Sequence, residues 1–172
     1  MYINCIRFLK NRGFGPVTER KRYMKRALVL ITVILLSGTA YYAFAQNTAQ
    51  AAAEFLVERG FAHHDKGNLD SAIADFGRAI LLNPVFAAAY VNRGFSYSEK
   101  GDFDKAIADF EAGLEFEPGN TLVKQSLVMM YISRGLAFSE NGDIGSARRD
   151  FEAALEIHPN HPMAKECLDA LK

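Results

Sequence analysis

Apolar residues after residue 52 recur at spacings of three and four, the period at which an α-helix returns to the same face. Two kinds of break interrupt this pattern at regular places. A glycine followed by a polar residue occurs at Gly67-Asn68, Gly101-Asp102 and Gly142-Asp143. Proline occurs at Pro84, Pro118 and Pro159. Glycine with a polar residue favours a tight turn, and proline stops a helix. The pattern predicts an all-α chain of paired helices.

The same residue types recur when residues 53–86, 87–120 and 128–161 are aligned. An Arg-Gly pair stands in the first helix of each unit, at Arg59-Gly60, Arg93-Gly94 and Arg134-Gly135. Alanine and then phenylalanine stand in the second helix, at Ala72 and Phe76, Ala106 and Phe110, and Ala147 and Phe151. Small residues let two helices approach closely. Each pair of helices is a hairpin that cannot bury both its faces alone, so we expect the hairpins to stack.

These units resemble the tetratricopeptide repeat in their glycine, alanine, aromatic and proline positions and in their period of about 34 residues. The least regular matches are Leu56, His63 and Gly113, where the family usually has two aromatic residues and an alanine. The resemblance implies a right-handed α-solenoid of three helical hairpins, and it covers residues 53–161.

Residues 162–172 follow the third unit and predict one more helix. Its apolar stripe contains Ala164, Cys167, Leu168 and Leu171, and charged residues occupy the other side. A solenoid needs a polar outer surface at its end, so we expect a capping helix. Cys167 lies in the apolar stripe and is expected to be an unreactive packing residue.

Seven residues, 121–127, are inserted between the second and third units. Seven residues make about two helical turns, so the insertion preserves the direction in which the helix faces. We expect one long helix over residues 121–140, capped by Asn120. The added turns carry Leu122, Val123 and Leu127. They pack on the preceding unit, or they form a surface for a partner or for self-association; the first interpretation is favoured.

Residues 27–45 contain no charge and follow Lys25 and Arg26. A basic start, a short apolar core weakened at Ser37-Gly38, and an end at Ala43-Phe44-Ala45 are the layout of a secretory signal peptide, cleaved after Ala45. The alternative is a retained signal anchor, since about 19 apolar residues can span a bilayer. Either interpretation predicts export, to the bacterial periplasm or to the outer face of the inner membrane.

Two boundaries stay open at this level. A signal peptide that starts at Met24 has a normal basic region, so translation starts at Met1 or at Met24. Residues 46–52 form a short linker or the start of the first repeat helix. The segment 1–45 is in both cases a leader, and the membrane is expected to be a partner only through it.

Charge is divided unequally along a chain whose formal net charge is zero. Residues 1–26 hold eight of the 20 basic residues and one of the 20 acids, which leaves 12 basic and 19 acidic residues and a net charge of −7. A net-acidic body without a basic stripe argues against nucleic acid as a partner.

The family resemblance also implies that the first helices of the hairpins line a concave groove that binds peptides. The groove positions carried over to this chain are Glu54, Val57, Phe61, His64, Asp65, Ala88, Val91, Asn92, Phe95, Ser98, Glu99, Met129, Ile132, Ser133, Leu136, Ser139 and Glu140. The family's carboxylate clamp is absent, since only Asn92 matches it. An apolar floor with acids on one rim fits a basic amphipathic peptide. The β-branched members are equally well interpreted as core residues.

No motif for catalysis, metal or cofactor binding stands out. The histidines at His63-His64 and at His158 and His161 occupy places that the repeat already explains, so we expect no metal site. The chain also lacks phosphate-loop, nucleophile-elbow and CxxC motifs. The leading hypothesis is an exported adaptor and not an enzyme. The alternative is a self-associating or membrane-anchored structural spacer, and a homo-oligomer is compatible with both.

Overall fold

The computed structural model describes the chain from Val17 to Leu171. Predictions about residues 1–16, and the role of Met1 as the start, lie outside this range. The described part is helical and contains no strand, which confirms the all-α fold. Its helices are α2 (Val17–His64), α3 (Leu69–Leu82), α4 (Ala87–Glu99), α5 (Phe103–Phe116), α6 (Thr121–Glu140), α7 (Ile144–Ile157) and α8 (Pro162–Ala170).

The chain divides into two compact units, one up to Asn47 and one from Thr48 onward. In the first unit, residues 28–44 of α2 are exposed and mostly apolar. By length and composition the helix over Lys25–His64 could cross a membrane, and a signal sequence near the N-terminus meets the same criterion. The expected weakening at Ser37-Gly38 does not interrupt the helix. The Ser37 hydroxyl donates to the carbonyl of Ile34 at 3.0 Å, so this polar side chain is satisfied within the helix. Residues 46–52 are also helical.

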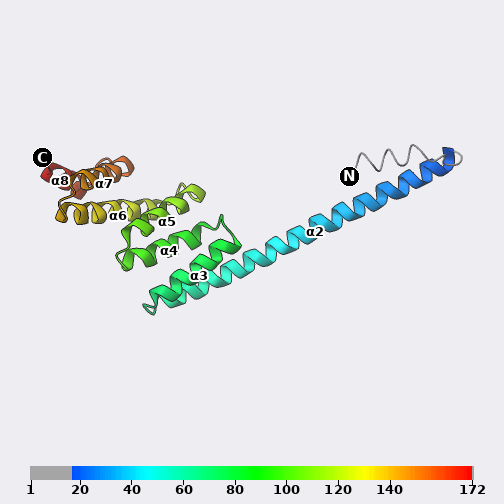
Figure 1. Cartoon of the computed structure of the whole chain (residues 1–172), viewed down its shortest axis with the longest axis horizontal. Helices are drawn as coiled ribbons and strands as arrows, with labels where there is room; N and C mark the ends of the chain where they lie inside the picture. Colours follow the sequence, from blue (N-terminus) through cyan, green and yellow to red (C-terminus); the bar gives the residue numbers. More distant parts are fainter. Residues whose placement is uncertain (1–16, 172) are drawn as a thin grey trace. The chain divides into compact units, whose positions relative to one another are not determined.

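The second unit is a stack of helices in which neighbours run in alternating directions (Figure 1). Its hairpins turn where glycine adopts a left-handed conformation, with φ of 73° at Gly67, 76° at Gly101 and 79° at Gly142. In the first turn the N–H of Gly67 donates to His64 and the N–H of Asn68 donates to His63. These bonds satisfy carbonyls that the helix end leaves free, and only glycine adopts such a φ without strain. The predicted turns are confirmed.

The two helices of each hairpin touch where a glycine faces a phenylalanine ring. A Cβ atom placed on Gly94 would lie 2.9 Å from Cε1 of Phe110, and Gly60 and Gly135 meet Phe76 and Phe151 in the same way. The three rings are at most 1% exposed. A side chain larger than hydrogen at these glycines would push the helices apart. The contact explains why glycine persists in a helix, where it costs about 1 kcal/mol relative to alanine.

A salt bridge repeats beside each of these contacts and was not predicted from the sequence. The guanidinium groups of Arg59, Arg93 and Arg134 each donate two hydrogen bonds, of 2.6–2.8 Å, to Asp75, Asp109 and Asp150 respectively. The aspartate side chains are only 4–8% exposed. A buried carboxylate needs such a partner, and the two-bond geometry fixes the alignment of the two helices.

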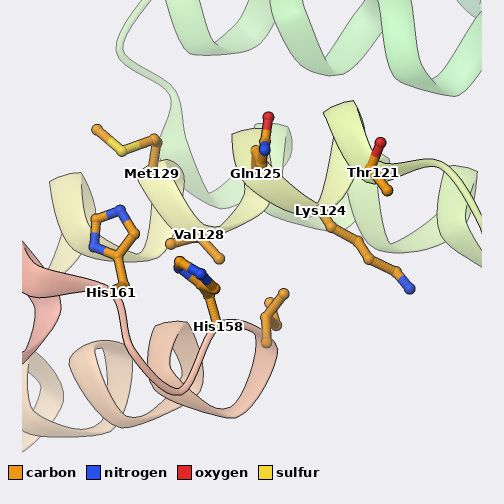
Figure 2. Close-up of a pocket in the computed structure, with 8 residues that line it drawn as sticks. Thr121, Lys124, Gln125, Val128, Met129, His158 and His161 are labelled. Carbon is orange, nitrogen blue, oxygen red and sulfur yellow. The ribbon is translucent and has the colours of Figure 1, made fainter.

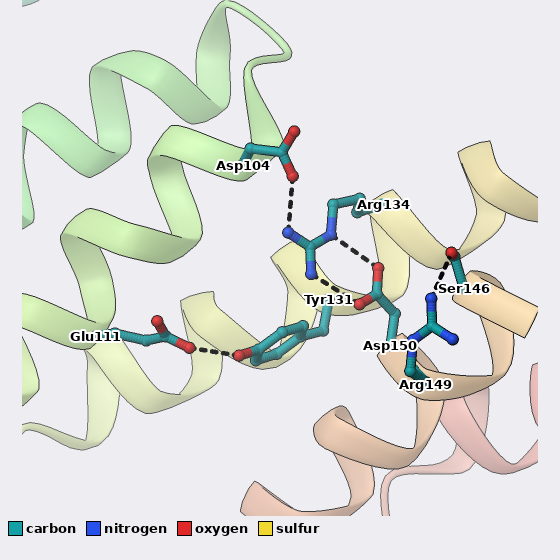
Figure 3. A network of polar contacts seen from close by, with 7 residues as sticks. All are labelled: Asp104, Glu111, Tyr131, Arg134, Ser146, Arg149 and Asp150. Atoms are coloured by element: carbon teal, nitrogen blue, oxygen red, sulfur yellow. Dashed lines mark hydrogen bonds and ion pairs between the residues drawn. The ribbon is translucent and has the colours of Figure 1, made fainter.

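The third of these pairs also connects two hairpins (Figure 3). Arg134 on α6 donates a further bond of 2.7 Å to Asp104 at the start of α5. On the same helix, the Tyr131 hydroxyl donates to Glu111 of α5. These contacts and the apolar cluster between α5 and α6 stack the third hairpin on the second.

Helix α6 runs over the span that the inserted residues predict, and the side chain of Asn120 accepts from the N–H of Val123 at 3.2 Å. Val123 and Leu127 are 0% and 4% exposed and pack in a cluster with Phe110. They belong to the core, so the alternative of a partner or self-association surface is wrong for these two residues. Of the three apolar residues in the inserted turns, Leu122 is the one that remains exposed, at 61%.

Helix α8 covers the end of the third hairpin. Ala164 is fully buried beside Phe151, and Cys167, Leu168 and Leu171 pack around the same cluster. Burial raises the pKa of the Cys167 thiol, which keeps it protonated and unreactive.

Replacing Gly94 with alanine should lower the free energy of unfolding by about 1–2 kcal/mol, because overpacking outweighs the gain in helix propensity. The matched control is Gly77→Ala in α3. There the nearest atom to a new Cβ is a side-chain nitrogen at 3.6 Å, so this variant should be neutral or stabilised by up to about 1 kcal/mol. Denaturant unfolding of both variants measures the difference. Equal stabilities would contradict the glycine–phenylalanine contact.

The Arg59–Asp75 pair should make stability depend on acid. The hydrogen bonds from Arg59 lower the pKa of Asp75. A lowered pKa in the folded state contributes stability above the unfolded carboxyl's pKa of about 3.9, and that stability is lost as pH falls through the lower folded value. Asp75→Asn should therefore cost about 1–3 kcal/mol at pH 7.

The deficit of Asp75→Asn should shrink as the pH falls below about 4. Urea unfolding from pH 7 to pH 2.5 measures it. Asp70→Asn is the control, since the Asp70 side chain is 88% exposed and its pair with Lys100 contributes little. A deficit of Asp75→Asn that stays constant over this range would overturn the assignment.

Candidate functional site

The predicted groove positions lie on α2, α4 and α6, the first helices of the three hairpins, except Asp65, which directly follows the end of α2. We call their exposed and half-buried members the A-helix face: Glu54, Val57, Phe61, His64, Asp65, Ala88, Val91, Asn92, Phe95, Ser98, Glu99, Met129, Ser133, Leu136, Ser139 and Glu140. Three large apolar side chains on it reach solvent, since Phe61 is 53% exposed and Met129 and Leu136 are each 41% exposed. Glu54, Glu99 and Glu140 are exposed among them.

Ile132 does not belong to this face. Its side chain is 1% exposed and packs in a core cluster with Val128 and Phe151. A ligand cannot reach it without opening the third hairpin, so its placement among the groove residues is corrected. Val57 and Val91 are half-buried and pack against the clusters beneath them. Val91 also fills the space above Gly113, where a Cβ would meet its Cγ2 at 2.7 Å.

Two residues in the middle of the face are held by the protein itself. Phe95 is half-buried and meets the ring of Phe110 edge to face, with centroids 5.0 Å apart. Asn92 donates its amide to the carbonyl of Ala88 at 2.8 Å, within its own helix. The Phe95 ring is therefore partly covered by the core, and the Asn92 amide is already engaged.

A titratable contact connects the first two hairpins at the edge of the face. Nε2 of His64 on α2 lies 3.2 Å from a carboxylate oxygen of Glu99 on α4. The imidazole nitrogen is buried and lacks the alignment of a hydrogen bond, so the contact is an ion pair only when His64 is protonated. Glu99 is half exposed and adds negative charge to the rim in either state.

The exposed side chains of the A-helix face are of the types that bind a partner and not of the types that catalyse a reaction. The exposed members of the A-helix face are apolar or acidic, and no nucleophile is paired with a base among them. Within the described residues, no three histidine, cysteine, aspartate or glutamate side chains converge as metal ligands. Apolar and acidic side chains of this kind are compatible with the binding of an apolar segment, whose charge the acids would select.

Models of known families match the repeats. The tetratricopeptide repeat model matches residues 87–120, a second tetratricopeptide repeat model matches residues 130–161, and a TPR repeat model matches residues 60–101. The chain belongs to the tetratricopeptide repeat family. Tetratricopeptide repeat domains are in general non-enzymatic modules that mediate binding to proteins or peptides.

One solved structure supports this fold, and others are similar to parts of the chain. The N-terminal domain of stress-induced protein-1 from C. elegans superposes with a TM-score of 0.53 at 20% identity, over 72% of this chain and 96% of that domain. The Arabidopsis OM64 TPR domain is 27% identical, with a TM-score of 0.48, over 72% of this chain and 97% of that one.

The first TPR of Spaghetti (RPAP3), bound to an HSP90 peptide, is 24% identical with a TM-score of 0.45, over 71% of this chain and 91% of its own. No curated protein sequence matches the chain.

The Arg–Asp pairs that hold α2, α4 and α6 against their partner helices were not predicted from the sequence. A signal was present, since an aspartate follows each of Arg59, Arg93 and Arg134 at a distance of 16 residues. Nor did the sequence indicate that Thr121 and Lys124 of the inserted turns border a pocket with the turn between α7 and α8.

Leu136 is exposed and Ile132 is buried on α6, so a charge introduced at these two positions should have different effects on stability. Leu136→Glu should leave the free energy of unfolding within about 0.5 kcal/mol of the wild type, because the side chain is exposed. Ile132→Glu should lower it by several kcal/mol, because an unpaired carboxylate would enter the core. Thermal and urea unfolding compare the two variants. A destabilised Leu136→Glu with a tolerated Ile132→Glu would reverse the assignment of the two faces.

Proposed function

We propose that this protein is an exported adaptor that binds a basic amphipathic peptide or helix on its A-helix face. The observation that carries the proposal is the exposure of Phe61, Met129 and Leu136 together with the acids Glu99 and Glu140. Large apolar side chains that gather on one exposed face often mark a site where a partner binds. Acids beside them favour a partner with lysine or arginine.

Export is the second part of the proposal. It rests on the uncharged stretch at residues 27–45, which follows Lys25 and Arg26 and ends in small residues. Cleavage after Ala45 releases a soluble adaptor, and retention gives an adaptor tethered to the outer face of the inner membrane. N-terminal sequencing of the mature chain distinguishes the two.

A defined peptide pair tests the binding. An amphipathic peptide of leucine and lysine should bind the full chain in lipid nanodiscs, and the affinity should fall as salt rises. The leucine–glutamate analogue should bind at least about tenfold more weakly, which corresponds to about 1.4 kcal/mol. Fluorescence anisotropy of labelled peptides measures both.

Matched variants locate the contact. Phe61→Ser with Leu136→Ser should weaken binding of the basic peptide by about tenfold or more, since large anchors dominate such interfaces. The control combines Phe55→Ser and Ile144→Ser, whose parent side chains are 60% and 42% exposed but are not on the A-helix face. Equal loss in both double variants would contradict the proposed face.

The structural spacer is the competing outcome. A spacer would show no saturable peptide binding, and its mass in nanodiscs or detergent would exceed that of a monomer. Photo-cross-linking from position 61 in the cell envelope then identifies what covers the face. Adducts only with a second copy of this chain would favour the spacer, and adducts with another protein would favour the adaptor.

A further inference from the structure

The seven inserted residues line part of a pocket at the N-terminal end of α6. Its walls are residues 121–129 of α6 and residues 157–161, where α7 ends and the chain turns into α8 (Figure 2). We call this pocket the notch. Its volume is about 450 Å³, within the range of roughly 300–1,000 Å³ that is typical of small-ligand pockets. Thr121, Lys124 and Gln125, which line it, all belong to the inserted turns.

The notch combines an apolar wall with a rim free of acids. Val128 and Met129 of α6 and Ile157 of α7 form the apolar part. None of the lining residues is acidic, although the chain after residue 26 carries 19 acids against 12 basic residues. The side chain of Lys124 is exposed, and its ammonium group makes no ion pair or hydrogen bond within the described residues, so it is able to turn toward a bound anion.

The hydrogen bond that His161 makes determines which kind of group the notch can bind. Nδ1 of His161 accepts from the N–H of Ala164 at 3.4 Å and caps α8. A nitrogen that accepts carries no proton, so the neutral ring carries its proton on Nε2, which is then a donor. A metal ion at Nε2 would require the lone pair that this proton occupies. The ring therefore favours a hydrogen-bond acceptor over a cation.

The second imidazole lies beside the first. The ring centroids of His158 and His161 are 5.5 Å apart and the planes are nearly perpendicular. Figure 2 shows both rings on one side of the notch with Met129 and Val128, whereas Lys124 borders its other side. An acceptor near the imidazoles would thus have an apolar surface next to it.

We propose that the notch binds a short apolar carboxylate. The apolar part lies against Val128, Met129 and Ile157, and the carboxylate accepts from Nε2–H of His161. Lys124, on the other side of the notch, contributes a longer-range attraction for the anion. Such a group is supplied by a free branched-chain acid or by the C-terminal residue of a peptide. Met129 belongs to both the notch and the A-helix face, so the two sites adjoin. Binding in the notch does not depend on the proposed peptide on that face.

Methionine methyl signals test the proposal in the full chain. The chain has five methionines, of which Met129 lines the notch and Met163 does not. With ¹³C-methyl methionine in lipid nanodiscs, 4-methylpentanoate should shift the Met129 methyl signal in a saturable manner and leave Met163 in place. The uncharged analogue 4-methylpentanamide should bind at least about tenfold more weakly.

Three variants assign the roles. Lys124→Gln should weaken binding of 4-methylpentanoate about threefold to tenfold, whereas Lys66→Gln, an exposed lysine far along the sequence, should have no effect. His161→Asn retains a capping side chain for α8 and removes the imidazole donor. It should abolish the preference for the acid over the amide while the fold, read from the remaining methyl signals, is retained.

A second probe distinguishes the two sources of the carboxylate. Tighter binding of N-acetyl-leucine than of 4-methylpentanoate would indicate a peptide C-terminus, and the reverse order would indicate a free acid. Equal affinity for the acid and the amide, or a Met129 signal that does not move, would overturn the proposal. Loss of peptide binding to the A-helix face in Phe61→Ser would not affect it.

Discussion

The contact between a glycine of one helix and a phenylalanine ring of the next is the constraint on which this structure depends. Three times along the chain, at Gly60, Gly94 and Gly135, a hydrogen atom in place of a side chain lets a fully buried ring lie against the backbone. Dense packing leaves no room for even one more methyl group without displacement. The distance between the helices of each hairpin follows from this contact.

The Arg–Asp salt bridges then fix how far one helix is shifted along the other, which apolar packing leaves undetermined. A ring on a glycine sets a distance, but it allows the helices to slide. The bidentate Arg–Asp pairs next to it have defined geometry and cost free energy if they are broken, because the carboxylates are buried. Arg134 extends the salt bridge to the neighbouring hairpin, because it binds both Asp150 of its own hairpin and Asp104 of the preceding one. Hairpin geometry and stacking are thus connected through one side chain.

The exposed chemistry of the molecule follows from this rigid frame. Because the core lies within and between the hairpins, α2, α4 and α6 leave a set of apolar and acidic side chains exposed. The inserted turns of α6 change the regular pattern once. They bury Val123 and Leu127 on the preceding hairpin, and the same two turns provide one wall of the notch.

Local features of the fold could be read from the sequence because short-range physics decides them. Glycine permits the left-handed φ of each turn, proline stops a helix, and Asn120 caps α6 where the insertion places its start. The spacing of 34 residues with its fixed glycines was sufficient to identify the family. These signals need no knowledge of distant neighbours.

Tertiary structure alone decided which helix faces are covered. Leu122 and Val123 are adjacent and both apolar, yet one is 61% exposed and the other fully buried, because α5 lies on only one side of α6. Ile132 was placed on the open face by its position in the repeat, but the third hairpin encloses it. Periodicity gives the direction of a side chain relative to its own helix. Whether another helix lies in that direction depends on how the hairpins stack, which long-range packing determines.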